Sequence, residues 1–311
     1  LLRQNSTRHS YTGYRPRCTF AECINSLLWL HNESFNCWSH ILGIPMVLLF
    51  FREELGFSFN PVMLLYLSTA LCFVLGSSFA HTFCCYYRLS HNASFVVDYI
   101  GLTIFSCGAG IAYVNFSFPL ELRVKSGLFG LSFLDTYLVF LCLCSAMSIF
   151  LSVWTRTLRE SFLRSILRVS AFASPGFFMS LPVLYKLLAC SFDNNNYPAN
   201  YCDSTALWSK QFIASITTIF FYVSRFPERL CPGKFDYFGH SHNVFHVGGL
   251  LALYYQKSAL SLDARFARSH QFSTPSMELP VLCISFLLLS IISACIYFRR
   301  LFVVNNSKPS H

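Results

Sequence analysis

Long apolar stretches separated by short polar connections dominate the sequence. A helix that crosses a bilayer needs about 20 mainly apolar residues. Eight stretches approach or meet that length: 36–52, 61–84, 94–115, 127–153, 165–189, 206–225, 241–260 and 279–298. The first is short, and the seventh is interrupted by His242, Asn243 and His246. The pattern predicts an all-α fold, a polytopic membrane helical bundle that occupies residues 36–298.

Both ends of the chain are more polar than this bundle. Residues 1–35 are basic at their beginning and lack the short apolar segment of a secretory signal peptide, and the chain begins with Leu1, as a fragment would. Apolar residues at helical spacing over 20–31 predict an amphipathic helix that lies in the membrane interface. Residues 299–311 form a short basic tail.

Composition excludes a soluble domain of ordinary kind. Apolar residues make up 54% of the chain and charged residues 12%, about half the usual charged share of a soluble domain. Mean hydropathy is +0.48 over 311 residues, which one short anchor cannot explain. The 17% aromatic share suits lipid-facing helices and interfacial belts.

The distribution of positive charge predicts an orientation. With the N-terminus inside, 15 of the 23 Lys and Arg residues fall in cytoplasmic segments and 8 on the opposite side. Eight spans then return the C-terminus to the cytoplasm. Anionic lipid at the inner leaflet accounts for the net charge of +9, so no nucleic-acid partner is needed. We expect a multi-pass protein of the plasma membrane rather than of an internal membrane.

The 14 cysteines are scattered, and many lie inside apolar stretches, where cysteine behaves as a small buried apolar residue. Only Cys190 and Cys202, in a polar segment between two predicted spans, are reasonable candidates for a disulfide.

Five polar residues from three distant segments are expected at one face of the membrane. His242 and His246 are four residues apart, so both can reach one zinc ion from one face of a helix. His81 lies near the end of the second predicted span, with Ser77 one turn earlier, and Asp98 opens the third. Inserting a charged side chain at the centre of a membrane helix costs about 2.5–3.5 kcal/mol, so ionisable residues at such positions are commonly functional. On spacing alone, a metal site and a set of ordinary interfacial residues are equally good interpretations.

The remaining histidines near the predicted helix ends have the more ordinary interpretation, that of hydrogen-bonded interfacial residues. They are His31, His40, His91 and His240.

Four sequence strings, together with their order, resemble the progestin and adipoQ receptor family: residues 31–43 (HNESFNCWSHILG), 77–83 (SSFAHTF), 98–101 (DYIG) and 227–246 (PERLCPGKFDYFGHSHNVFH). The resemblance extends over about residues 13–260. It implies a zinc ion held by His81, His242 and His246, with the family's neighbouring serine and aspartate at Ser77 and Asp98.

Two departures from the family pattern leave these ligands in place. Asn243 stands where the family usually has glutamine, and Ser39 where it usually has threonine. The Gly-His-Ser-His string and the eighth apolar stretch resemble the membrane progestin receptor branch, which implies a seven-span core plus an eighth C-terminal span.

Three functions are compatible with these features. The first is a membrane receptor for a steroid (progestin-like) or another lipid, with an intramembrane zinc site near the cytoplasmic face. The second is a zinc-dependent lipid amide hydrolase, similar to alkaline ceramidases. In that enzyme Asp98 would orient or deprotonate a water molecule at the open zinc position and Ser77 would hydrogen-bond the oxyanion. The third is a structural zinc site, which Cys84 or Cys85 would close as a fourth ligand.

The expected partners follow from these functions. They are a steroid or a sphingolipid-like small molecule, together with membrane lipids. A G protein is a further candidate that the sequence does not decide.

Overall fold

The computed structural model describes residues 12–57, 60–159, 161–192, 196–272 and 278–299. These residues form helices and contain no β-strand, only two isolated bridges. The helices of about 20 residues or more are α2 (Ser34–Phe57), α3 (Pro61–Phe83), α4 (His91–Ala112), α6 (Phe133–Thr155), α7 (Phe162–Phe192), α8 (Thr205–Ser224), α9 (Ser241–Ser269) and α10 (Glu278–Tyr297). The short ones are α1 (Phe20–Asn25) and α5 (Leu120–Arg123).

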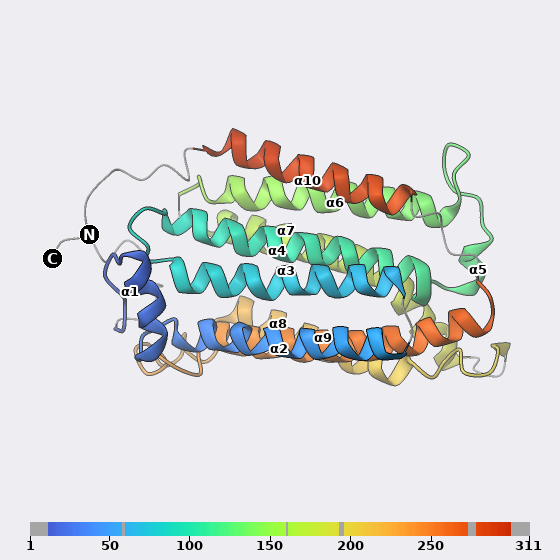
Figure 1. Cartoon of the computed structure of the whole chain (residues 1–311), viewed down its shortest axis with the longest axis horizontal. Helices are drawn as coiled ribbons and strands as arrows, with labels where there is room; N and C mark the ends of the chain where they lie inside the picture. The colour runs from blue at the N-terminus through green and yellow to red at the C-terminus, as the bar shows by residue number, and fades with distance from the viewer. Residues whose placement is uncertain (1–11, 58–59, 160, 193–195, 273–277, 300–311) are drawn as a thin grey trace.

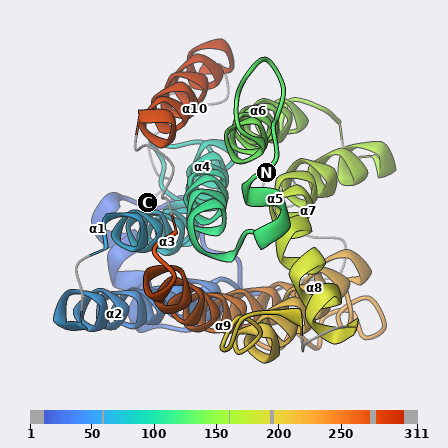
Figure 2. The same ribbon diagram turned by 90° about the vertical axis from the view of Figure 1, so that its right-hand side faces the viewer.

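The long helices lie side by side and alternate in direction, because short connections return the chain at each end of the bundle (Figure 1). One end carries α1 and the other carries α5; we call them the α1 end and the α5 end. Helices α2, α8 and α9 lie on one side of α3 and α4. Helix α10 packs against α6 at the opposite edge (Figure 2).

Six of the described helices are long and apolar enough to cross a membrane: α2, α3, α4 with the π-helical turn Tyr113–Ser117 that follows it, α6, α7 and α10. Helices α8 and α9 have 20 and 29 residues but do not reach that apolarity. Helix α9 falls short because it carries buried polar residues such as Asn243, Gln256 and Asp263. The predicted polytopic helical membrane fold is confirmed, while the number of spans stays a prediction.

Side-chain caps explain where two helices differ from their predicted ranges. Helix α6 begins at Phe133 and not at 127, because the hydroxyl of Ser132 accepts a hydrogen bond from the backbone N–H of Asp135. Helix α4 begins at His91, where Ser90 caps the N–H of Ala93. Asp98 therefore lies about two turns inside α4 and does not open it.

The predicted interfacial helix over 20–31 is shorter than expected. Helix α1 starts with a capping box of Thr19 and Glu22, ends at Asn25 and continues as a 3₁₀ turn over Ser26–Leu28. Large apolar side chains remain exposed along this segment, Leu28 among them. The predicted C-terminal tail lies outside the described residues, apart from residue 299.

Helices α3 and α4 approach closely where two glycines face the opposite backbone. A Cβ atom on Gly101 would lie 2.8 Å from the carbonyl oxygen of Cys72, and one on Gly76 would lie 3.0 Å from that of Val97. Small residues at such crossings let two backbones pack directly. The crossing fixes the register of α3 against α4 beside Ser77 and Asp98.

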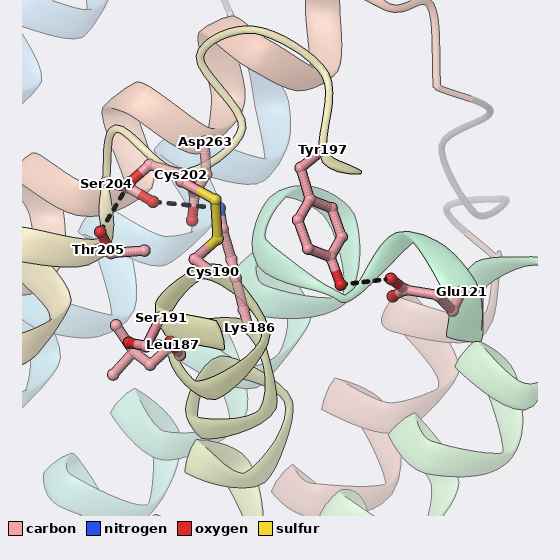
Figure 3. Close-up of a disulfide and its surroundings, with 10 residues drawn as sticks. All are labelled: Glu121, Lys186, Leu187, Cys190, Ser191, Tyr197, Cys202, Ser204, Thr205 and Asp263. Atoms are coloured by element: carbon pink, nitrogen blue, oxygen red, sulfur yellow. Dashed lines mark hydrogen bonds and ion pairs between the residues drawn. A yellow bond between two sulfur atoms is a disulfide. The ribbon is translucent and has the colours of Figure 1, made fainter. Parts of the chain in front are cut away.

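The α5 end is held by a disulfide and a buried ion pair. Cys190 and Cys202 form the disulfide that the sequence predicted (Figure 3). One turn before Cys190, the ammonium of Lys186 lies 2.7 Å from Oδ1 of Asp263, and both side chains are buried. Ser204 accepts a second hydrogen bond from Lys186, and the indole N–H of Trp208 donates to Asp263. This network joins α7, α8 and α9.

Candidate metal site

Three histidine side chains meet at the α1 end of the bundle. His81 lies two residues before the end of α3, and His242 and His246 lie in the first turns of α9. Because α3 ends at the same end of the bundle where α9 begins, residues far apart in sequence share one depth. The Nε2 atom of His81 lies 3.4 Å from that of His242 and 3.2 Å from that of His246, and the last two are 3.3 Å apart.

These distances match the spacing of ligands around one ion. Histidine nitrogens bind zinc at about 2.0–2.1 Å, so two of them on a tetrahedral ion lie about 3.3–3.4 Å apart. His81 and His246 are almost fully buried and His242 is half-buried. The chemistry of three imidazoles facing one point fits a zinc ion with one position left open.

Two side chains orient the imidazole rings of His81 and His246. One belongs to Glu33, just before α2, and the other to Ser39, within α2. Oε2 of Glu33 lies 2.8 Å from Nδ1 of His81. The hydroxyl of Ser39 donates to the carbonyl oxygen of Asn36, so its oxygen is free to accept from Nδ1 of His246 at 2.9 Å. Each contact favours the tautomer with the proton on Nδ1, which leaves the Nε2 lone pair directed at the metal position.

Glu33 is itself held in place by two amides. Nδ2 of Asn36 donates to its carboxylate at 2.7 Å, and Asn243 donates to the amide oxygen of Asn36 at the same distance. Burial raises the pKa of Glu33, but the hydrogen bonds from His81 and Asn36 outweigh this effect and hold the pKa below its usual value. The carboxylate is therefore ionised and places a negative charge behind His81.

Sequence reasoning did not single out Glu33. An acidic residue at the very beginning of an apolar stretch was the available signal, because a charge at that depth needs a partner.

Ser77 and Asp98 lie next to the histidines, as their depths suggested. Ser77 is buried one turn before His81, and its side chain lies beside that of Asp98. Asp98 also interacts electrostatically with His81. A carboxylate and a hydroxyl at the edge of a three-histidine site can accept a proton and donate a hydrogen bond, respectively.

The prediction that His40 is an interfacial residue is wrong. Its side chain is buried, its ring packs against that of His246 with 4.1 Å between centroids, and neither ring nitrogen has a hydrogen-bond partner within the described part of the chain. It lies on the inner face of α2, where packing against α3 and α9 excludes water. His240, in contrast, is the residue that precedes α9 and lies outside the group of three.

Neither Cys84 nor Cys85 joins the histidines among the described residues. The thiol of Cys84 donates to the carbonyl oxygen of His81. That of Cys85 faces Cys23 instead. The geometry thus provides three protein ligands and does not favour a fourth from these cysteines.

Comparison with known proteins places the chain in a family. Residues 28–257 match the model of the haemolysin-III related family, and the chain belongs to that family. Membrane progestin receptor gamma of Mus musculus is 34% identical over 305 residues, which cover 92% of this chain and 88% of that protein. The Homo sapiens protein of the same name is 33% identical over equal shares, and membrane progestin receptor delta of Mus musculus is 30% identical over 81% of this chain and 74% of that protein. The predicted family and its membrane progestin receptor branch are confirmed.

Proposed function

We propose that this multi-pass membrane protein is a receptor for a steroid (progestin-like) or another lipid, and that His81, His242 and His246 bind one zinc ion within it. The convergence of three Nε2 atoms carries the metal proposal. The names of the relatives, membrane progestin receptors, support the ligand class.

A groove between α8 and α9 is suitable for such a ligand. Its volume is about 570 Å³, and ligand pockets commonly measure about 300–1,000 Å³. Apolar side chains such as Ile213, Val247 and Leu251 line most of it, with Lys210 and Asn243 among the few polar ones. Apolar walls with a few polar anchors are typical of sites for small lipids.

The groove is connected to the proposed metal site through hydrogen bonds. Asn243 lines the groove and donates to Asn36, which donates to Glu33, which in turn contacts His81. A ligand that moves α9 against α8 would therefore act on the histidines through three side chains.

Saturable binding of a radiolabelled progestin to membranes that contain this protein is the direct test. Ile213→Trp fills the groove and should lower the affinity at least tenfold. Ile216→Trp is the matched control, because both isoleucines are 65% exposed on α8 and only Ile213 lines the groove. Absence of saturable binding to the wild type would overturn the steroid proposal. Equal losses of progestin affinity in both variants would overturn the assignment of the groove as the steroid site.

Elemental analysis tests the metal. The variant with all three histidines changed to alanine should contain one equivalent of zinc less than the wild type. His240→Ala is the control, because His240 lies outside the group of three and its removal should leave the zinc in place. Equal zinc in the wild type and the triple variant would contradict the proposed ligands.

We further propose that the α1 end faces the cytoplasm at the plasma membrane. The excess of Lys and Arg supports this orientation, and so does the disulfide at the α5 end, since disulfides persist in oxidising compartments. With eight spans the C-terminus lies on the same side as the N-terminus. Antibodies against tags at the two termini should bind only after permeabilisation, whereas labelling of intact cells would overturn the orientation or the number of spans.

The hydrolase is a second candidate, which the positions of Asp98 and Ser77 beside the histidines favour. Zinc on three histidines would supply a Lewis acid with one open coordination position. Asp98 would accept a proton there, and Ser77 would donate a hydrogen bond to the amide carbonyl of a ceramide-like substrate.

Asp98→Asn separates the two functions. If signalling depends on hydrolysis, release of a sphingoid base and the downstream response should fall together by about 10²–10⁴-fold, as expected for loss of a general base. If the receptor binds steroid without hydrolysis, saturable steroid binding should persist in this variant. Robust ceramide turnover without steroid binding would favour the enzyme over the receptor.

A further inference from the structure

Three cysteines from two separate segments meet at the α1 end of the bundle. Cys18 and Cys23 belong to the N-terminal segment and α1, and Cys85 follows α3. All three side chains are buried, and their sulfur atoms lie within 4.8 Å of one another. The Sγ atoms of Cys23 and Cys85 are 3.6 Å apart. We call this group the cysteine cluster.

The backbone holds this cluster together without help from the thiols. The N–H of Cys18 donates to the carbonyl oxygen of Cys85 at 2.9 Å, and the N–H of Tyr87 donates to that of Cys18 at 2.9 Å. The ring of Phe20 stacks on that of Phe83 with 5.0 Å between centroids, which places α1 over the end of α3. The three sulfur atoms are therefore preorganised by contacts that involve other groups.

Their spacing suits a soft metal ion. Thiolates bind zinc at about 2.3 Å, so two of them on one ion lie about 3.8 Å apart, or slightly more in a trigonal arrangement. Thiolate ligands select zinc and monovalent copper among the biological metals. A single buried cysteine behaves as a small apolar residue, but packing alone does not require three sulfur atoms to face one point.

A neighbouring guanidinium offsets the negative charge that three thiolates would bring. Arg15 donates to the sulfur of Cys84 at 3.3 Å, next to Cys85 in the chain. It also donates to the carbonyl oxygens of His81 and Thr82 and to the hydroxyl of Ser26. Three thiolates with one Zn²⁺ or Cu⁺ carry a net negative charge, and Arg15 lies close enough to balance part of it.

We propose that Cys18, Cys23 and Cys85 bind one thiophilic ion, Zn²⁺ or Cu⁺, which fastens the N-terminal segment to the end of α3. Binding releases the thiol protons to solvent and leaves the oxidation state of the sulfur unchanged. This site shares no ligand with the three histidines. A disulfide between Cys23 and Cys85 is the competing arrangement, and it would leave Cys18 without a role.

Metal analysis of the full chain, purified in detergent under reducing conditions, tests the proposal. Zinc and copper per chain are measured in the wild type, Cys23→Ser, Cys85→Ser and the triple His→Ala variant. Cys37→Ser is the matched control, because Cys37 is fully buried in the first turn of α2 at the same end but lies outside the cluster. Each cluster variant should lose one equivalent of zinc or copper, whichever metal the wild type carries, and Cys37→Ser should lose none.

A second measurement starts from the wild type, so its main readout does not depend on the folding of a variant. A thiol-specific organomercurial added to the wild type should release one metal equivalent, and the triple His→Ala variant should release the same amount. Reconstitution with Co²⁺ should also give a near-ultraviolet thiolate charge-transfer band in both proteins and none in Cys23→Ser. The histidine site can fail its own test without affecting either readout.

Two results would overturn the cysteine site. One is the absence of both mercurial-released metal and the cobalt band in the wild type. The other is peptide mapping of protein alkylated in its native membrane that finds Cys23 and Cys85 joined as a disulfide.

Discussion

Glu33 connects the N-terminal boundary of α2 with the candidate metal site. Its carboxylate lies 2.8 Å from Nδ1 of His81 and is held by Asn36. A carboxylate behind a metal-binding histidine fixes the ring and makes the opposite nitrogen more basic. Glu33 would therefore act on a metal bound at the proposed site through His81, as a positioning residue.

Glu33→Gln should weaken zinc binding by about 10–100-fold, because glutamine keeps the shape but loses the charge that polarises His81. Competition against a zinc chelator of known affinity measures the change. Glu54→Gln serves as the control, since Glu54 is half-buried toward the other end of α2. If Glu33→Gln binds zinc as tightly as the wild type, Glu33 does not orient the ligand.

The three histidines of this site could be predicted from the sequence, but the side chains that contact them could not. His242 and His246 share a helix face, and the spans bring His81 to the same depth, so the group of three follows from spacing, topology and the family resemblance. Glu33 and Ser39 act through contacts between different helices, and the pattern within one helix does not specify which neighbour it faces. His40 was misjudged for the same reason: its burial is a property of the packed bundle.

At the scale of elements, the crossing of α3 and α4 depends on two glycines. Gly76 and Gly101 let each backbone approach the other helix, next to Ser77 and Asp98. Any side chain at Gly101 must push α4 away from the carbonyl oxygen of Cys72, which belongs to a helix backbone and cannot rotate aside.

Gly101→Ala should destabilise the protein by about 1–3 kcal/mol, the usual cost of overpacking. It should also separate Ser77 from Asp98. Thermal unfolding in detergent, followed by tryptophan fluorescence, measures the first effect. Gly249→Ala is the control on α9, where a Cβ atom would meet nothing within 4 Å, and we expect it to be neutral. Equal midpoints for both variants would show that the crossing tolerates a methyl group.

Helix positions were predictable where apolar stretches are long, and less so at their ends. The sequence placed α3 and α10 within one residue of their observed bounds. The start of α6 was missed by six residues because apolar residues before Ser132 belong to a turn. Helix α9 illustrates a different limit: buried polar residues such as Asn243, Gln256 and Asp263 reduce the apolarity by which a span is recognised.

At the scale of the whole molecule, the two ends of the bundle carry different chemistry. Histidine nitrogens and cysteine sulfurs gather at the α1 end. The α5 end has the disulfide and the pair of Lys186 and Asp263 (Figure 3). Helix α9 takes part in both, with His242 and His246 near its start and Asp263 near its end. Helix α9 thus contributes residues to both groups.

The sequence predicted the disulfide at the α5 end but not the ion pair beside it. Cys190 and Cys202 stood out because they share a polar segment between spans. Lys186 and Asp263 lie 77 residues apart on different helices, so no spacing pattern within one segment links them. Their pairing depends on how α7 packs against α8 and α9, which a single sequence does not reveal.

Lys186→Met should destabilise the protein by about 3–5 kcal/mol, because it leaves the buried carboxylate of Asp263 without its counter-charge. Asp263→Leu should do the same for the ammonium of Lys186. The double variant should recover much of the loss, since apolar side chains of similar size can replace a buried pair. Lys125→Met, in an exposed loop at the same end, is the control and should change stability by less than about 0.5 kcal/mol. Unfolding midpoints of the four variants in one detergent test whether the two charges stabilise the protein as a pair. Additive losses of stability in the double variant would mean that they stabilise the bundle independently.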